Sequence, residues 1–143
     1  MMTGDIIKLN LSVDINNQWF VSVWVEMHGR KAVVRFKVDT GCNSVVLSHS
    51  TLKSLGISTS NANLSKLSDE TAKLASGEKS SFKSLGAVSL SLDKVQSVPI
   101  CNAKAICHAT RKTNDLLGTE VFKQFASVAF NLAGDKYMEL KKS

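Results

Sequence analysis

Residues 34–48 read VRFKVDTGCNSVVLS, and this stretch decides the fold of the chain. Val34, Phe36 and Val38 alternate with charged residues, which indicates a strand with one buried face. A second apolar run at residues 44–47 predicts another short strand. The tripeptide Asp39-Thr40-Gly41 therefore lies on a tight loop between two strands, and its carboxylate stands at the end of the first.

The same period of two recurs outward from this stretch and predicts strands along most of the chain. Residues 58–70 are polar and look least ordered, and a short helix is expected to end at Gly56. We therefore predict an all-β fold, a closed barrel or sandwich with one or two short helices, in a single domain spanning residues 1–143. The strands are expected at residues 9–15, 19–27, 34–38, 44–47, 71–75, 80–85, 88–92, 128–132 and 137–140, with two more between 94 and 107 broken at Pro99, and turns at 16–17, 28–29, 76–78 and 134–135.

Composition limits the classes of function. The 143 residues carry a net charge of +6, spread along the chain, and 6% of them are aromatic. Dispersed charge with few aromatic residues argues against nucleic acid as a partner. No apolar run approaches the roughly 20 residues that span a bilayer, so no membrane partner is expected. Three cysteines, an odd number, and no signal-peptide pattern predict a reducing, cytoplasmic location.

The Asp39-Thr40-Gly41 loop suggests acid–base chemistry. A lone exposed carboxylate, with a pKa of about 3.9, is a poor general base at neutral pH. Two carboxylates about 3 Å apart cannot both ionise, so such a pair supplies one acid and one base together. Glycine permits close approach of two backbones. The alternative interpretation is that the tripeptide is an ordinary turn.

Three segments, taken together, resemble the retropepsin-like aspartic proteases. Residues 38–48 and the following 52–57 are similar to the family's active-site segment, and residues 116–125 are similar to its late apolar-apolar-Gly segment and short helix. Residues 75–78 are similar to the tip of the flap, the hairpin that closes over substrate. The resemblance implies a retropepsin-like barrel with one lobe per chain and aspartic endopeptidase activity on peptide or protein substrates, with no cofactor.

The resemblance also implies roles for individual residues. Asp39 would be the catalytic acid and base. Support for its loop would come from Thr40, Gly41, Leu117 and Gly118. The flap at residues 71–85 would contact the substrate backbone through Ala75, Ser76 and Gly77. Cys42 departs from the family, which usually has a small Ala, Ser or Thr there; its thiol is a weak donor and a site for oxidation.

The sequence contains a single Asp-Thr-Gly. The second carboxylate is therefore expected from another copy of the chain, and the resemblance implies a twofold homodimer. The expected contact between the two copies is either the N-terminal extension, residues 1–18, through a strand at residues 6–13, or the C-terminal strand at residues 137–140.

The sequence gives little indication of a metal site. Cys42, Cys101, Cys107 and the three histidines lack the spacing of a metal site, so no metal is expected. Two rival interpretations of function remain open. One is a non-catalytic retropepsin-fold module for dimerisation or peptide binding, and the weaker one is a basic nucleic-acid-associated domain.

Overall fold

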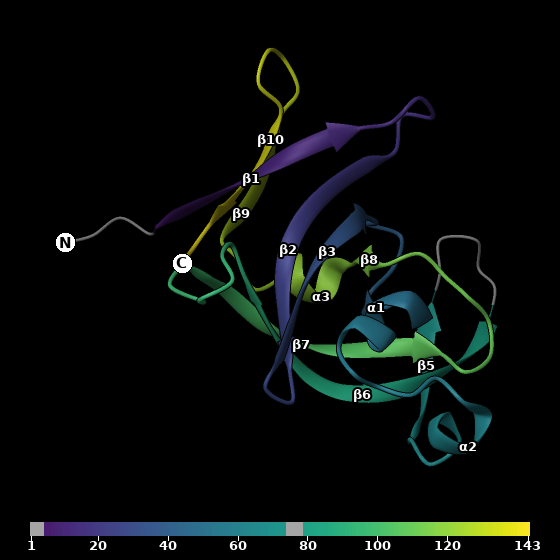
Figure 1. Cartoon of the computed structure of the whole chain (residues 1–143). Helices are drawn as coiled ribbons and strands as arrows, with labels where there is room; N and C mark the ends of the chain where they lie inside the picture. Colours follow the sequence, from purple (N-terminus) through teal and green to yellow (C-terminus); the bar gives the residue numbers. More distant parts are fainter. Residues whose placement is uncertain (1–4, 74–78) are drawn as a thin grey trace.

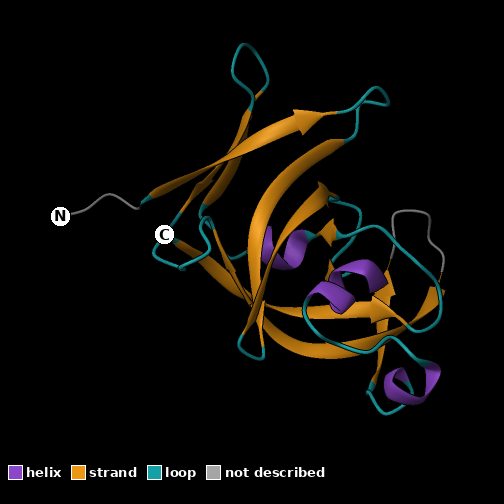
Figure 2. Cartoon of the chain, in the orientation of Figure 1, coloured by secondary structure: helices purple, strands orange, loops and turns teal. Residues whose placement is uncertain are grey.

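Strands dominate the computed structural model, which describes residues 5–73 and 79–143 (Figures 1 and 2). The all-β prediction is confirmed, since the only helices in the described residues are three short ones. The strands are β1 (Ile6–Val13), β2 (Trp19–Met27), β3 (Arg30–Val38), β4 (Val45–Val46), β5 (Asp69–Lys73), β6 (Lys79–Ser91), β7 (Pro99–His108), β8 (Leu116–Leu117), β9 (Ser127–Asn131) and β10 (Tyr137–Lys141), and the helices are α1 (His49–Ser54), α2 (Asn61–Leu64) and α3 (Thr119–Phe122).

Six strands close into a barrel. Within the described residues the order runs β6-β7-β4-β8-β3-β2, and β2 pairs again with β6. The short strand β8 lies between β3, to which it is parallel, and β4, to which it is antiparallel. The chain therefore inserts a late segment between the two strands that flank the Asp39 loop.

Alternation along the strands builds the core. On β2 the side chains of Val21, Val23 and Val25 are almost fully buried, and so are Val34 and Phe36 on β3. The turn between β2 and β3 is the expected pair His28-Gly29, both with positive φ. Such a two-residue turn matches the twist of paired strands, so the hairpin that leads to Asp39 has a fixed register.

Strands β1, β10 and β9 form an antiparallel extension outside the barrel (Figure 1). The first part of β1 pairs with β10 over Ile6↔Lys141 to Asn10↔Tyr137, and its last part pairs with β2. The extension is therefore continuous with the barrel through β1. Among the described residues, no helix has the length and apolar character needed to cross a membrane.

Four local predictions were wrong. Residues 80–85 and 88–92, expected as two strands, belong to the single strand β6, which has a register shift at Gly86. The first strand was expected at residues 9–15, but β1 spans Ile6–Val13, and Ile15 lies in the following turn and is 98% exposed. Residues 94–107 were expected as two strands broken at Pro99, yet Pro99 begins a single strand, β7; a first position suits proline because its missing N–H is not needed there. The polar residues 58–70 contain the helix α2, whose N-cap Ser60 accepts a hydrogen bond from the Asn63 amide.

Candidate active site

The Asp39 loop is held mainly by backbone hydrogen bonds. Asp39 directly follows β3, and its amide donates to the carbonyl oxygen of Leu117 at 3.0 Å. The Gly41 amide donates to Asp39 Oδ1 at 3.0 Å, and the Cys42 amide donates to the Asp39 carbonyl at 3.2 Å. The Asp39 side chain is half-buried. One carboxylate oxygen is thus tied to its own loop, which fixes the direction of the other.

Gly118 closes the underside of this loop. A Cβ at this buried position would lie 2.5 Å from the carbonyl oxygens of both Cys42 and Ser44, well inside contact distance. The next two amides, of Thr119 and Glu120, donate to the carbonyls of Cys42 and Asn43 at 3.0 and 2.9 Å. Only glycine allows this approach of two backbones, so the structure gives a physical reason for Gly118.

The four residues expected to support the Asp39 loop all lie close to it, but they differ in exposure to solvent. They are Thr40, Gly41, Leu117 and Gly118. Leu117 is buried at 2%, and its carbonyl supports Asp39 as described. Thr40 and Gly41 are exposed. In the described part of the chain the Thr40 hydroxyl has no hydrogen-bond partner. Thr40 is therefore free to contact something other than its own protomer.

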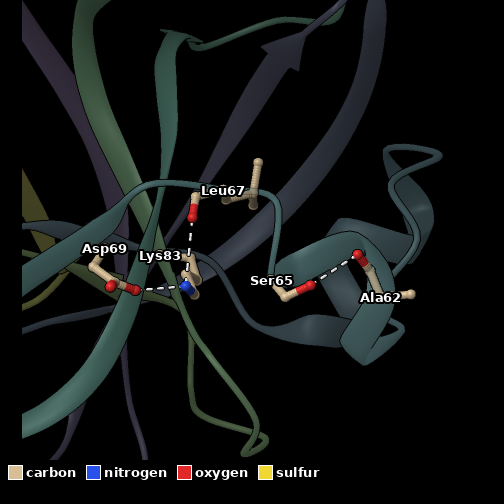
Figure 3. A network of polar contacts seen from close by, with 5 residues as sticks. All are labelled: Ala62, Ser65, Leu67, Asp69 and Lys83. Carbon is tan, nitrogen blue, oxygen red and sulfur yellow. Dashed lines mark hydrogen bonds and ion pairs between the residues drawn. The ribbon is translucent and has the colours of Figure 1, made fainter.

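The hairpin expected as a flap is present as β5 and β6. The two strands pair from Asp69↔Lys83 to Lys73↔Lys79. Ala75, Ser76 and Gly77, the expected tip, lie outside the described residues. At the base of the hairpin, Lys83 Nζ contacts the Asp69 carboxylate and the Leu67 carbonyl, while Ser65 bonds the Ala62 carbonyl in α2 (Figure 3). The Lys83–Leu67 hydrogen bond joins the hairpin to the preceding segment, and the Lys83–Asp69 ion pair joins its two strands.

Comparison with known proteins identifies the family. The family model described as aspartyl protease matches residues 21–121, which include the Asp39 loop, the β5–β6 hairpin and Gly118. The chain belongs to the aspartyl protease family. Among solved structures, it is similar to a retropepsin-like aspartic protease from Rickettsia conorii, with a TM-score of 0.60 and 16% identity over 100% of this chain and 98% of that one. A search of curated proteins found no match.

The structural likeness shows that this aspartyl protease family member has a retropepsin-like fold, as the sequence resemblance implied. The family match ends at Val121, within α3, and begins at Val21 in β2. It therefore contains the whole barrel apart from the start of β2, and leaves out β1, β9 and β10. The extension outside the barrel is the part of this family member that the match does not describe.

Cys42, the departure from the family pattern, directly follows Gly41 and is buried at 1% exposure in a cluster with Val46, Phe82 and Ile106. Its thiol donates to the Ser44 carbonyl at 3.5 Å. Burial raises the pKa of the Cys42 thiol, and the negative charge of Asp39 adds to this effect. Burial likewise raises the pKa of Cys101 and of Cys107 to about 11. All three cysteines are therefore protonated at neutral pH and unsuited to act as thiolate nucleophiles.

The polar groups near the loop do not form a metal site. Among the described residues, no three His, Cys, Asp or Glu side chains gather closely enough to hold a metal ion. Asp115, which sequence reasoning did not single out, turns toward α1 instead. Its carboxylate accepts from the Ser48 amide at 2.6 Å and from the Thr51 hydroxyl at 3.0 Å. This contact spans 67 residues of sequence, so no local motif could reveal it.

Proposed function

We propose that this protein is an aspartic endopeptidase whose catalytic pair consists of Asp39 from each of two protomers. The observation that carries the proposal is the Asp39 loop itself, in which one carboxylate oxygen is fixed by the Gly41 amide and the loop is locked by Gly118. Membership in the aspartyl protease family supports the same chemistry. A single Asp-Thr-Gly in the sequence makes a second copy necessary for the pair.

The proposed reaction moves protons between two carboxyl groups and one water. The ionised Asp39 takes a proton from water while the water oxygen bonds to the peptide carbonyl carbon, and the protonated Asp39 donates to the carbonyl oxygen. The resulting tetrahedral diol returns one proton to a carboxylate as the C–N bond breaks, and the leaving nitrogen receives a proton from the other carboxyl group. The products are a carboxylic acid and an amine, and the pair again holds one proton.

The substrate in this proposal is an extended peptide between the Asp39 loop and the β5–β6 hairpin. A strand-like peptide can be held by backbone hydrogen bonds on both sides. The exposed Thr40 and Gly41 would face the partner protomer, where the threonine hydroxyl could brace the matching loop. The flap contacts of Ala75, Ser76 and Gly77 remain part of this proposal.

In this proposal the two protomers meet through the extension outside the barrel, and the strand pairing indicates which of its strands can pair with the partner. Strand β10 is paired over the whole of residues 137–141, with β1 on one side and β9 on the other. It therefore has no free backbone edge to offer a partner strand. In the described residues β9 pairs only with β10, and residues 6–10 of β1 also pair only with β10. Backbone pairing between copies would therefore use β9 or the first part of β1, and β10 would contribute side chains.

Dilution tests the shared pair. If an active site needs two protomers, the rate of peptide cleavage falls faster than enzyme concentration once dimers dissociate. In that range a tenfold dilution should lower the initial rate about a hundredfold, because dimer concentration follows the square of monomer concentration. The measurement is the cleavage rate of a fluorogenic peptide across a dilution series, with molar mass determined by sedimentation.

Two copies joined in one chain by a flexible linker provide the matched control. The linker makes association intramolecular, so the rate of this tandem protein should stay proportional to its concentration. The shared pair would be refuted if the unlinked protein also showed strict proportionality while sedimenting as a monomer.

A further inference from the structure

A surface cavity of about 420 Å³ lies apart from the Asp39 loop, where β2 and β3 approach α1 and the segment before β8. Its walls include Phe20 and Arg35 from the two strands, Lys53 from α1, and residues 112–115. This volume falls within the range of small-molecule sites, roughly 300–1,000 Å³. The proposed peptidase chemistry makes no use of this cavity.

The cavity carries an excess of positive charge. Arg35, Lys53 and Lys112 line it, and the described residues contain no ion pair for any of the three. The single acidic group in the wall is Asp115, whose two oxygens already accept hydrogen bonds from Ser48 and Thr51. Its charge offsets one of the three cations, and the cavity remains attractive to an anion.

Arg35 is held by an aromatic ring. Its guanidinium carbon lies 3.7 Å from the centroid of the Phe20 ring, and both residues line the cavity. Stacking covers one face of the planar guanidinium and leaves its N–H edge to donate. That edge matches the paired oxygens of a phosphate or carboxylate. Because the Phe20 ring already restricts the Arg35 side chain, anion binding costs Arg35 less conformational entropy than it would cost an unstacked arginine.

Thr113 adds a hydrogen-bond donor without a partner. Its Oγ1 is buried and has no hydrogen-bond partner in the described residues, and the residue lines the same cavity. A buried polar group without a partner is costly, and in folded proteins it often marks a bound water or ligand. Turning this hydroxyl toward a ligand oxygen breaks no hydrogen bond within the described protein.

We propose that this cavity binds a phosphate group. A phosphate ester carries a charge of about −1.5 to −2 at neutral pH and presents three strong acceptor oxygens. It therefore suits three cations and a hydroxyl donor better than a carboxylate, which is planar and singly charged. The phosphate could belong to a small phosphomonoester or to a phosphorylated side chain, since both present the same group.

Titration with inorganic phosphate at constant ionic strength tests the site directly. In ¹H–¹⁵N NMR spectra of the whole protein, saturable shifts are expected for the amides of Thr113, Asn114 and the start of α1. Lys112→Gln removes one cation and should weaken phosphate binding about tenfold. Arg35→Lys keeps the charge but loses the stacked fork, so several-fold weaker binding is expected.

Lys66→Gln is the matched control, because Lys66 is exposed and lies outside the cavity; it should bind phosphate like the wild type. Asp39→Asn should also bind normally, which separates this proposal from the peptidase proposal. The site would be ruled out if sodium chloride added without phosphate produced the same shifts, or if Lys66→Gln and Lys112→Gln weakened phosphate binding equally. Citrate binding as tightly as phosphate would contradict the preference for phosphate.

Phenyl phosphate and a phosphoserine peptide identify the source of the group. Tighter binding of phenyl phosphate than of the peptide would assign the site to small phosphomonoesters, and the reverse order would assign it to phosphorylated polypeptides. Either order supports the phosphate site, provided that the unphosphorylated peptide and phenol do not bind. Binding of these two compounds as tight as that of their phosphorylated forms would overturn it.

Discussion

Replacing Asp39 with Asn should lower peptide cleavage at least about a thousandfold, because an amide can neither accept nor release the proton that the reaction moves. The change leaves the shape of the side chain almost the same. The Gly41 amide, now 3.0 Å from Asp39 Oδ1, can donate to the new amide oxygen. The loop should therefore keep its structure, and the melting temperature should change little. Cleavage of a peptide library, followed by mass spectrometry, measures the activity.

Glu26→Gln is the control for this change, because Glu26 lies beside the β2–β3 turn, at the opposite end of β3 from Asp39, and pairs with Lys31 only at 3.9 Å; its activity should equal that of the wild type. Undiminished cleavage by Asp39→Asn would disprove the aspartic mechanism. If the wild type bound peptides without cleaving any, the non-catalytic binding module would be the better account.

Gly118→Ala should have the second large effect, on both stability and activity. The added Cβ would meet two carbonyl oxygens at 2.5 Å and the Ser44 amide nitrogen at 2.9 Å. All three are backbone atoms, so the clash cannot be relieved by rotating a side chain. Overpacking of this kind costs about 1–3 kcal/mol of the free energy of unfolding. A displacement of the Asp39 loop by about 1 Å should also lower the turnover of the folded enzyme about a hundredfold.

Urea denaturation measures the free energy of unfolding, and turnover is normalised to the folded fraction. Gly29→Ala, in the turn between β2 and β3, is the matched control: Gly29 has φ +76° and no atom within 4 Å of an added Cβ. Only the cost of a positive φ applies there, about 1 kcal/mol, and activity should be unchanged. Wild-type stability and turnover in Gly118→Ala would show that the close approach to the loop is unimportant.

Much of the fold is predictable from side-chain alternation. The strand from Trp19 to Met27 buries every second residue from Val21 onward, and β3 buries Val34 and Phe36, as the sequence indicates, although β3 begins at Arg30, four residues before the predicted start. The turns at His28-Gly29 and Gly134 and the end of α1 at Gly56 all have the positive φ that their residue types allow. Local chemistry decides these features, so local sequence reveals them.

Other features depend on contacts between distant segments. Residues 80–85 and 88–92 look like separate strands, but β6 runs through both, with a register shift at Gly86 (φ +82°). A β-bulge with glycine in this conformation bends a strand without ending it. The two-residue strand β8 is too short to show a period. Pairing with β3 and β4 defines it.

The functional residues also fall into two groups, those that the sequence reveals and those that only the fold brings together. Asp39 and Gly118 can be found from the sequence because each lies in a short recognisable segment, and the structure joins these segments by backbone hydrogen bonds. The charged cavity cannot be found from the sequence, because Arg35, Lys53 and Lys112 are far apart in sequence and come together only in the folded chain. The sequence shows their charge but not that they line a common cavity.

Mixing wild-type protein with a ninefold excess of Asp39→Asn protein, under conditions where subunits exchange, tests the central claim most directly. If every active site needs Asp39 from both protomers, most wild-type subunits will pair with an inactive partner. Activity per wild-type subunit should then fall to about one-tenth. Unchanged activity per wild-type subunit, in a mixture shown by mass spectrometry to contain mixed dimers, would contradict a catalytic pair shared between two copies.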